Sequence, residues 1–247
     1  PTTYNLDPDD LARKVTPRTR AIMAVDIFGH PADWDQVTVV ARRHGLRIID
    51  DSCEALGAEY RGRKLGTFGD AAAFAFYPNK QMTTGEGGIV VTDSDEIAAL
   101  CRSLRNQGRG EMGSWLEHER LGYNYRMTEM QAALGLSQLT RLETFLEKRA
   151  AVASLYTERL AGLDQAGTAV RPPVVLPHVR MSWFVYVVTL VSGLDRDPVM
   201  ARMEAQGIPT RGYFAPIHTQ AYFKERFGDL RGTLPVTESV AQRTIAL

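Results

Sequence analysis

The chain of 247 residues is long enough for one large domain, or for one domain with a smaller appendage. Its 29 Lys and Arg residues balance 29 Asp and Glu residues, so no basic surface for nucleic acid is expected. Two cysteines make no disulfide framework, and no apolar run approaches the roughly 20 residues of a membrane span. No signal peptide is visible, so we expect a globular protein of the cytosol.

The first third of the chain predicts a parallel βαβ unit. A short helix begins at 7–10, where a proline and acidic residues fill the first turn. The apolar run 21–28 predicts a buried strand, 32–44 a helix that ends at Gly45, and 46–51 a second buried strand. Strand, helix and strand with short connections are typical of a parallel sheet.

The middle of the chain predicts a strand at 71–77, a second at 89–91 and a helix at 93–104. A polar and aromatic loop, 109–126, follows, of the kind that often carries function. Thr128 and Gln131 form a capping box that opens a long helical region to about residue 160. We expect its buried face to consist of Leu134, Leu139, Leu142, Phe145 and Leu146.

The composition changes near Gly162, where prolines mark a linker. Beyond it we expect a strand at 183–190 and helices at 198–206 and 221–227. The sequence therefore predicts a large domain, 1–162, that includes the long connecting helix, and a smaller α/β domain, 163–247. Because the chain opens without an initiator methionine and ends within an apolar segment, we expect the N-terminal part of the large domain to be missing and the small domain to be truncated.

One lysine differs from the others in its sequence context. Lys80 follows the apolar run 74–77 and Pro78, and it precedes a glycine cluster at 85–88. Desolvation at a rigid strand end favours the neutral, nucleophilic amine, and glycines let the backbone approach a bulky group. We hypothesise that Lys80 forms a Schiff base with pyridoxal phosphate. The alternative, a solvated surface lysine, suits the other four: Lys14, Lys64, Lys148 and Lys224.

A pyridoxal cofactor also needs a carboxylate at its ring nitrogen, so that the ring accepts electrons from the substrate carbanion. Asp51 ends the strand 46–51, and parallel sheets bind ligands at the carboxyl ends of their strands. Asp50 competes for this role, but neighbouring residues of a strand face opposite ways. Asp51 as a helix N-cap is an equally good interpretation from the residues alone.

Several stretches resemble the DegT/DnrJ/EryC1/StrS family of sugar aminotransferases, in the correct order and over nearly the whole chain. A single one of these motifs would be weak, and five in order are strong. The stretches are Ile49 to Ala58, Phe74 to Lys80, Gly85 to Gly88, Leu104 to Gly108 and Gly122 to Met127.

The resemblance implies a fold-type I enzyme with a mixed, mostly parallel sheet, working as a homodimer with active sites at the subunit interface. It identifies Lys80 as the Schiff-base lysine and Asp51 as the partner of the pyridine nitrogen. Glu54 would stand beside the phenolate oxygen of the cofactor, and Asn124 would reach the cofactor phosphate of the neighbouring subunit. The implied reaction moves an amino group, usually from glutamate, to a nucleotide-linked keto sugar for surface polysaccharide or glycoside synthesis.

The chain departs from the family pattern at two residues. Ala75 replaces a serine whose hydroxyl donates to the phosphate, and Thr83 or Thr84 are the candidates to compensate for it. Glu54 replaces a common glutamine; beside a phenolate it must be either turned away or protonated. The N-terminal region that normally supplies a phosphate turn and a stacked aromatic ring also lies outside the sequence.

Three further groups have weaker signals. His218 and Tyr213 are candidates for sugar contact, because the Pro-Ile-His region of the family lies near the substrate, although a lone histidine in a loop is more often structural. Cys53 and Cys101 are more often small buried hydrophobes than nucleophiles. The spacing of His and Cys residues indicates no metal site.

Three other functions compete with this interpretation. A sugar 3-dehydratase of the same fold has histidine in place of the lysine, so Lys80 disfavours it. A dinucleotide-binding domain needs G-x-G-x-x-G before a helix, whereas the cluster at 85–88 precedes a strand. A non-catalytic regulatory or scaffold module is left open by Ala75, Glu54 and the absent N-terminal part.

Overall fold

The computed structural model describes residues 2–110, 117–164, 170–191 and 193–247. The chain packs as two compact units that alternate along the sequence. The first, here called the sheet unit, comprises Asn5–Lys148 and Leu176–Phe184. The second, the C-terminal unit, comprises Pro1–Tyr4, Arg149–Val175 and Val185–Leu247. The domain boundary at residue 162 stays a prediction.

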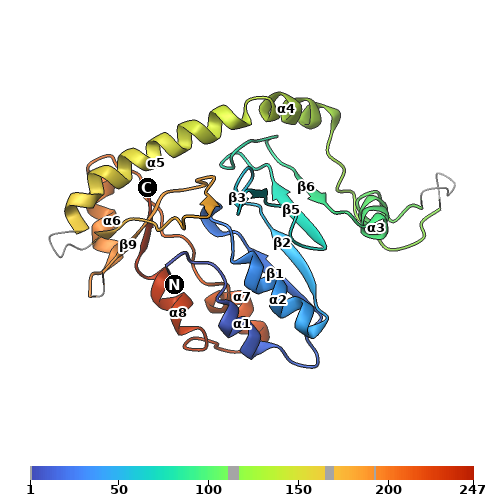
Figure 1. Ribbon diagram of the computed structural model, residues 1–247, viewed down its shortest axis with the longest axis horizontal. Helices are drawn as coiled ribbons and strands as arrows, with labels where there is room; N and C mark the ends of the chain where they lie inside the picture. The colour runs from blue at the N-terminus through green and yellow to red at the C-terminus, as the bar shows by residue number, and fades with distance from the viewer. Residues whose placement is uncertain (1, 111–116, 165–169, 192) are drawn as a thin grey trace. The chain divides into compact units, whose positions relative to one another are not determined.

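The sheet unit opens with the predicted helix and βαβ arrangement (Figure 1). Asp7 caps the first helix with hydrogen bonds from two backbone N–H groups, and Asp33 caps the second. Gly45 ends the second helix in the left-handed conformation, φ 62°, that a side chain would disfavour. The elements are α1 (Pro8–Lys14), β1 (Ala21–Val25), the 3₁₀ helix η1 (Ile27–Gly29), α2 (Trp34–His44) and β2 (Arg47–Asp51).

The main sheet has the strand order β1-β2-β5-β6, with β5 at Ala71–Ala75 and β6 at Gly88–Val91. β1, β2 and β5 are parallel, and β6 is antiparallel to β5. The predicted mixed, mostly parallel sheet is therefore confirmed. Because the three parallel strands end at one edge, the residues that follow β1, β2 and β5 gather there.

The core of the sheet unit lies on the face covered by α2. Ile22 and Ile48 point into it from the strands, and Trp34 and Val37 from the helix. Buried and exposed residues alternate along β1 and β2, as expected for strands with a single covered face.

A small three-stranded sheet, β4-β3-β8, joins distant parts of the sheet unit. β3 (Glu59–Tyr60) and β4 (Arg63–Lys64) form an antiparallel hairpin. β8 (Val179–Arg180) comes from much later in the chain, and Arg180 forms ion pairs with Glu59 and Glu143. The segment Leu176–Phe184 is thereby held against the sheet unit.

After β6, the helix α3 spans Asp95–Arg105. The long helical region that begins at Thr128 consists of two helices, α4 (Glu129–Leu139) and α5 (Leu142–Asp164). The capping box of Thr128 and Gln131 is present as predicted. The predicted buried face is correct for Leu142 and Leu146 but wrong for Leu134 and Leu139, which are exposed. The cause is packing: Leu146 of α5 lies against the turn at Gly57, whereas α4 leaves these leucines uncovered.

The C-terminal unit is a small α/β arrangement around an antiparallel sheet of order β10-β9-β7. Its strands are β7 (Val170–Arg171), β9 (Val187–Leu190) and β10 (Thr244–Ala246). Its helices are α6 (Arg196–Ala205), η2 (Ile217–Thr219), α7 (Ala221–Phe227) and α8 (Pro235–Ala241). The helices predicted at 198–206 and 221–227 are therefore present.

Three strands are shorter than the sequence predicts by two residues or more. β1 ends at Val25, because Phe28 has φ 60°, and β9 begins only at Val187, after Trp183 with φ 53°. A positive φ takes a residue out of the extended conformation, so neither apolar run continues as a strand. β5 ends at Ala75, before the run of apolar residues does.

Candidate active site at the carboxyl edge of the sheet

Lys80 lies in the turn that follows β5, where its backbone N–H bonds to the carbonyl of Tyr77 at 3.0 Å. Its side chain is only 14% exposed. Nζ lies 3.6 Å from Oε1 of Glu54 and 4.0 Å from the centre of the Phe184 ring. An amine so enclosed, with a carboxylate and an aromatic face as neighbours, is not a solvated surface group.

Glu54 is the carboxylate that faces Lys80. Its Oε2 accepts a hydrogen bond of 2.9 Å from the backbone N–H of Phe28, which the left-handed conformation of that residue directs. Burial raises the pKa of Glu54, and the Phe28 N–H and Lys80 oppose that rise. The Glu54 carboxyl group is turned towards the Lys80 amine and held by the backbone, and its position relative to a cofactor oxygen stays a prediction.

Asp50 and Asp51 lie on opposite faces of β2, as the alternation requires. Asp50 is fully buried, whereas Asp51 is partly exposed and accepts a hydrogen bond of 3.2 Å from the backbone N–H of Cys53. Burial first, and then Asp51, raise the pKa of Cys53 to about 12, while Lys80 opposes them. Asp51 and Lys80 therefore both act on the thiol of one residue, and that thiol is protonated at neutral pH.

Both threonines of the glycine-rich turn use their hydroxyl groups inside the turn. Thr83 donates to the carbonyl of Phe76 at 3.0 Å, and Thr84 donates to that of Glu86 at 2.6 Å. At Gly87 a side chain would meet Thr84 Oγ1 at 2.5 Å. Thr83 and Thr84 were the candidates to replace the hydroxyl that Ala75 lacks. Both already donate their hydroxyl hydrogen to a backbone oxygen.

Two residues near Lys80 escaped sequence reasoning. Gln81 is buried; its Nε2 donates to Ser182 Oγ at 2.8 Å, and its Oε1 has no partner among the described residues. Phe184 reaches Lys80 because its N–H bonds to the carbonyl of Phe28 at 3.1 Å. No sequence motif marks Gln81 or Phe184, because the contacts of Gln81 with Ser182 and of Phe184 with Phe28 join residues about 100 or more positions apart.

The close approach of this distant segment depends on one glycine. Gly29 has φ 92°, its carbonyl accepts from the N–H of Ser182 at 3.0 Å, and a Cβ there would lie 2.7 Å from Ser182 Oγ. A side chain at Gly29 would therefore push the segment 176–184, and the Phe184 ring with it, away from Lys80.

Asn124 is not part of this cluster of contacts. It is exposed, and it forms an isolated bridge with Asn106 at the end of α3. The flanking residues Tyr123 and Tyr125 also bond to the last turn of α3 through their backbones. Its reach to a cofactor of a neighbouring subunit stays a prediction. Residues 111–116 of the loop before it lie outside the described residues.

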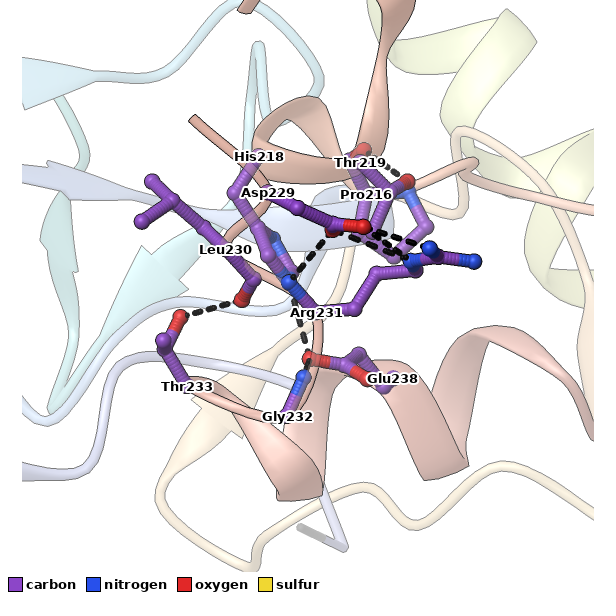
Figure 2. A network of polar contacts seen from close by, with 9 residues as sticks. All are labelled: Pro216, His218, Thr219, Asp229, Leu230, Arg231, Gly232, Thr233 and Glu238. Atoms are coloured by element: carbon purple, nitrogen blue, oxygen red, sulfur yellow. Dashed lines mark hydrogen bonds and ion pairs between the residues drawn. The ribbon is translucent and has the colours of Figure 1, made fainter. Parts of the chain in front are cut away.

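His218 and Tyr213 belong to the C-terminal unit, and each has a partner there. His218 is 8% exposed, and its Nε2 lies 2.9 Å from Oε1 of Glu238 (Figure 2). The same oxygen accepts from the N–H of Gly232 at 2.8 Å, and the His218 contact in particular holds the pKa of Glu238 below its ordinary value. The carbonyl of Tyr213 accepts from Thr244 Oγ1. Contact of either side chain with a sugar stays a prediction.

In the part of the chain that the structure describes, no group of three or more His, Cys, Asp or Glu side chains could hold a metal ion. None of the helices described there has both the length and the apolar character needed to cross a membrane.

The family model of the DegT/DnrJ/EryC1/StrS aminotransferase family matches residues 1–247. A GDP-perosamine synthase of Caulobacter vibrioides is 44% identical over 88% of the chain and 58% of its own length. A dTDP-3-amino-3,4,6-trideoxy-alpha-D-glucose transaminase of Streptomyces venezuelae is 39% identical over 98% of the chain and 62% of its own length.

Among solved structures, DesV of S. venezuelae is similar with a TM-score of 0.89 and 37% identity, over 98% of this chain and 63% of that one. The expected fold-type I aminotransferase fold is confirmed by this likeness. The chain spans less than two thirds of the length of the curated relatives that it matches.

Proposed function

Because the chain belongs to the DegT/DnrJ/EryC1/StrS aminotransferase family, we propose that the whole protein transfers an amino group to a nucleotide-linked keto sugar with pyridoxal phosphate as cofactor. Glutamate is the proposed amino donor. The named relatives support a product sugar for surface polysaccharide or a glycoside, since one is a GDP-perosamine synthase and another a dTDP-amino-sugar transaminase. The proposed compartment is the cytoplasm.

The observation that carries this proposal is the enclosed amine of Lys80, which faces Glu54 and the Phe184 ring beyond the end of β5, at the edge of the sheet where β2 ends in Asp51. An amine and a carboxylate at one edge of a sheet fit a planar ring that needs a covalent anchor and an anionic partner. When bound, pyridoxal phosphate supplies an electron sink for the carbanion formed at the substrate carbon.

Each residue then has a role that its surroundings support. Lys80 would bind the cofactor covalently through Nζ and, once displaced by the amino donor, carry a proton to and from the substrate carbon. Asp51 would hold a proton on the ring nitrogen. Glu54, fixed by the N–H of Phe28, would orient the Lys80 amine, and the Phe184 ring would exclude water from it.

The proposal includes a homodimer with shared active sites. Asn124 would act on the cofactor of the neighbouring subunit, which its exposed position allows. Exposed apolar side chains on α4 support a surface that a second copy covers. Contact of the sugar with His218 and Tyr213 belongs to the same proposal.

The first experiment is the addition of pyridoxal phosphate to the wild-type chain and to Lys80→Ala. We expect a visible absorption band in the wild type, loss of this band in Lys80→Ala, and the band intact in Lys14→Ala, which changes an exposed lysine of α1. A panel of keto sugar nucleotides is then incubated with the full-length protein and glutamate. A band that survives Lys80→Ala contradicts the anchor, and amination of no sugar contradicts the substrate class.

A non-catalytic module is the second candidate, and one observation favours it. Ala75 lacks a hydroxyl, and Thr83 and Thr84 donate theirs to backbone carbonyls, so a phosphate here loses a hydrogen bond of roughly 1.5–3 kcal/mol. Absence of any absorption band in the full-length wild type would support this second candidate.

A further inference from the structure

Three polar residues are fully buried where β1 and β2 end. Asp26 follows β1, Asp50 lies in β2, and Ser52 follows β2; each has 0% of its surface exposed. None of the ion pairs in the described part of the chain includes Asp26 or Asp50. Two carboxylates without a cation would repel each other at a site where burial already disfavours charge.

The hydrogen bonds around the three residues leave one proton to be accounted for. Ser52 Oγ lies 2.9 Å from Asp26 Oδ2 and 2.7 Å from Asp50 Oδ1. A hydroxyl has a single hydrogen, so it donates to only one of the two oxygens. The other short contact is a hydrogen bond only if that carboxyl group itself carries a proton.

The remaining hydrogen bonds leave one oxygen of each carboxyl group for Ser52. Asp26 Oδ1 accepts from the N–H of Ala32 at 2.7 Å and from Trp34 Nε1 at 3.1 Å, so Oδ2 is the oxygen that faces Ser52. Asp50 Oδ2 accepts from the N–H of Gly66 at 2.9 Å, so Oδ1 is the oxygen that faces Ser52. Burial, reinforced by the charge of Asp50, raises the pKa of Asp26 well above its ordinary value, so Asp26 is the member of the pair that keeps the proton.

Of the titratable groups near Asp26 and Asp50, Asp51 raises a pKa of the pair, and Asp33 is hydrogen-bonded to residues outside the pair. Asp51, next along β2, raises the pKa of Asp50 further. Asp33, at the start of α2, accepts from Gln36 and from the hydroxyl of Tyr60 on β3. β5, on the other side of β2, brings only alanine and phenylalanine.

We propose that Asp26, Ser52 and Asp50 share one proton in a hydrogen-bonded chain, and that this chain positions Asp51 at the end of β2 and Glu54 in the loop that follows it. Ser52 lies between these two residues in the sequence. Asp26 bonds through its N–H to the carbonyl of Asp51 at 3.0 Å, and it precedes Phe28, whose N–H holds Glu54. The shared proton is independent of the protein's activity; the positioning role rests on the proposed function.

The proton is tested by unfolding the wild type and Asp26→Asn in urea between pH 5 and 8. Folded Asp26 keeps a proton that the unfolded chain loses near pH 4, so wild-type stability falls as pH rises towards the folded pKa. Relative to Asp26→Asn, we expect the wild-type unfolding equilibrium constant to rise with pH above the unfolded pKa, by up to about tenfold per pH unit until the pH reaches the folded pKa. A ratio that does not change with pH overturns the shared proton.

A measurement on the wild type alone keeps the test valid if Asp26→Asn does not fold. With ¹³C at the aspartate carboxyl carbons, nuclear magnetic resonance should show one carboxyl carbon in its protonated form at pH 7. Ionised signals from every aspartate at pH 7 overturn the proposal. Asp70→Asn is the matched control: it changes a carboxylate that precedes β5 and accepts from the N–H of Ile48 in β2, and it should leave the protonated signal in place.

The positioning role is tested by titrating pyridoxal phosphate into Ser52→Ala. We expect affinity to fall about tenfold, the equivalent of one hydrogen bond, while the absorption band still forms at Lys80. Asp70→Asn should keep wild-type affinity although it loses stability. Unchanged affinity in Ser52→Ala overturns the positioning role; a wild type that forms no band refutes the proposed function and this role together, and leaves the shared proton standing.

Discussion

At the scale of single residues, the candidate site is made of groups whose neighbours decide their chemistry. Glu54 would repel an anion if it were free, but the N–H of Phe28 and the amine of Lys80 hold its two oxygens. Burial first, and then Asp51, raise the pKa of Cys53 to about 12, which removes it as a nucleophile at neutral pH. The sequence supplies these residue types, and their partners come from other segments.

The pKa of Asp70 is shifted in the opposite direction to that of Asp26. Its Oδ2 accepts from the N–H of Ile48 at 2.8 Å, and Oδ1 pairs with Arg47 at 2.7 Å. The Ile48 N–H first, and then Arg47, hold the pKa of Asp70 below its ordinary value. Its contribution to stability is therefore complete above the unfolded pKa of about 3.9 and is lost as pH falls through the folded pKa.

We expect Asp70→Asn to lower the free energy of unfolding by about 1–2 kcal/mol at pH 7, because it removes hydrogen bonds to a charged group. The difference from the wild type should shrink at pH 3. Urea unfolding at both pH values measures it, and Asp93→Asn, at an exposed position, should change stability by less than about 0.5 kcal/mol. An equal loss at pH 3 and pH 7 would contradict the assignment.

At the scale of elements, the helical region after residue 128 shows how packing divides a continuous pattern. The leucine spacing predicts a long helical region with one buried face, whereas the structure divides this region into α4 and α5 and buries only part of that face. α4 is fixed at its start by the capping box and by Gln131 Nε2, which donates to the carbonyl of Glu86 at 3.0 Å. Its first turn thereby joins the glycine-rich turn near Lys80.

We expect Thr128→Ala to weaken the start of α4 by about 1 kcal/mol, because the N–H of Gln131 loses its acceptor. Amide hydrogen exchange in the first turn of α4 should become several-fold faster. Thr128→Ser, which keeps the oxygen, should exchange like the wild type. Equal exchange in Thr128→Ala and the wild type would show that the cap does not hold the helix.

At the scale of the whole molecule, exposed apolar residues on α4 support assembly. Four of its side chains are more than 40% exposed: Met130, Leu134, Leu136 and Leu139. An unpartnered apolar surface of this kind marks an interaction site more often than a solvated face. The homodimer implied by the family resemblance offers a second copy as the partner.

We therefore expect the wild-type chain to self-associate and Leu136→Lys to weaken this association at least tenfold, since a buried charge would disrupt an apolar contact. Light scattering coupled to gel filtration measures the mass over a range of concentrations. Ser137→Lys adds the same charge at an adjacent exposed position and should associate more strongly than Leu136→Lys. A wild type that is monomeric at every concentration contradicts the prediction.

The sequence by itself determined the elements, the sheet and the family. Apolar periodicity, caps and glycine stops are local signals, so α2, α3 and the βαβ unit could be predicted to within a few residues. Lys80 and Asp51 could be named because residues that follow parallel strands share an edge. The lengths of β1 and β9 could not be predicted from the sequence, because the positive φ of Phe28 and Trp183 depends on contacts made elsewhere in the fold.

Only the tertiary structure decided what surrounds those residues. The Phe184 ring at Lys80, the Ser182 contact at Gly29, and the proton shared by Asp26 and Asp50 all join segments that lie far apart in the sequence. The physical reason is that desolvation and hydrogen-bond geometry depend on distance in space, whereas the patterns that sequence reasoning uses extend over a few residues.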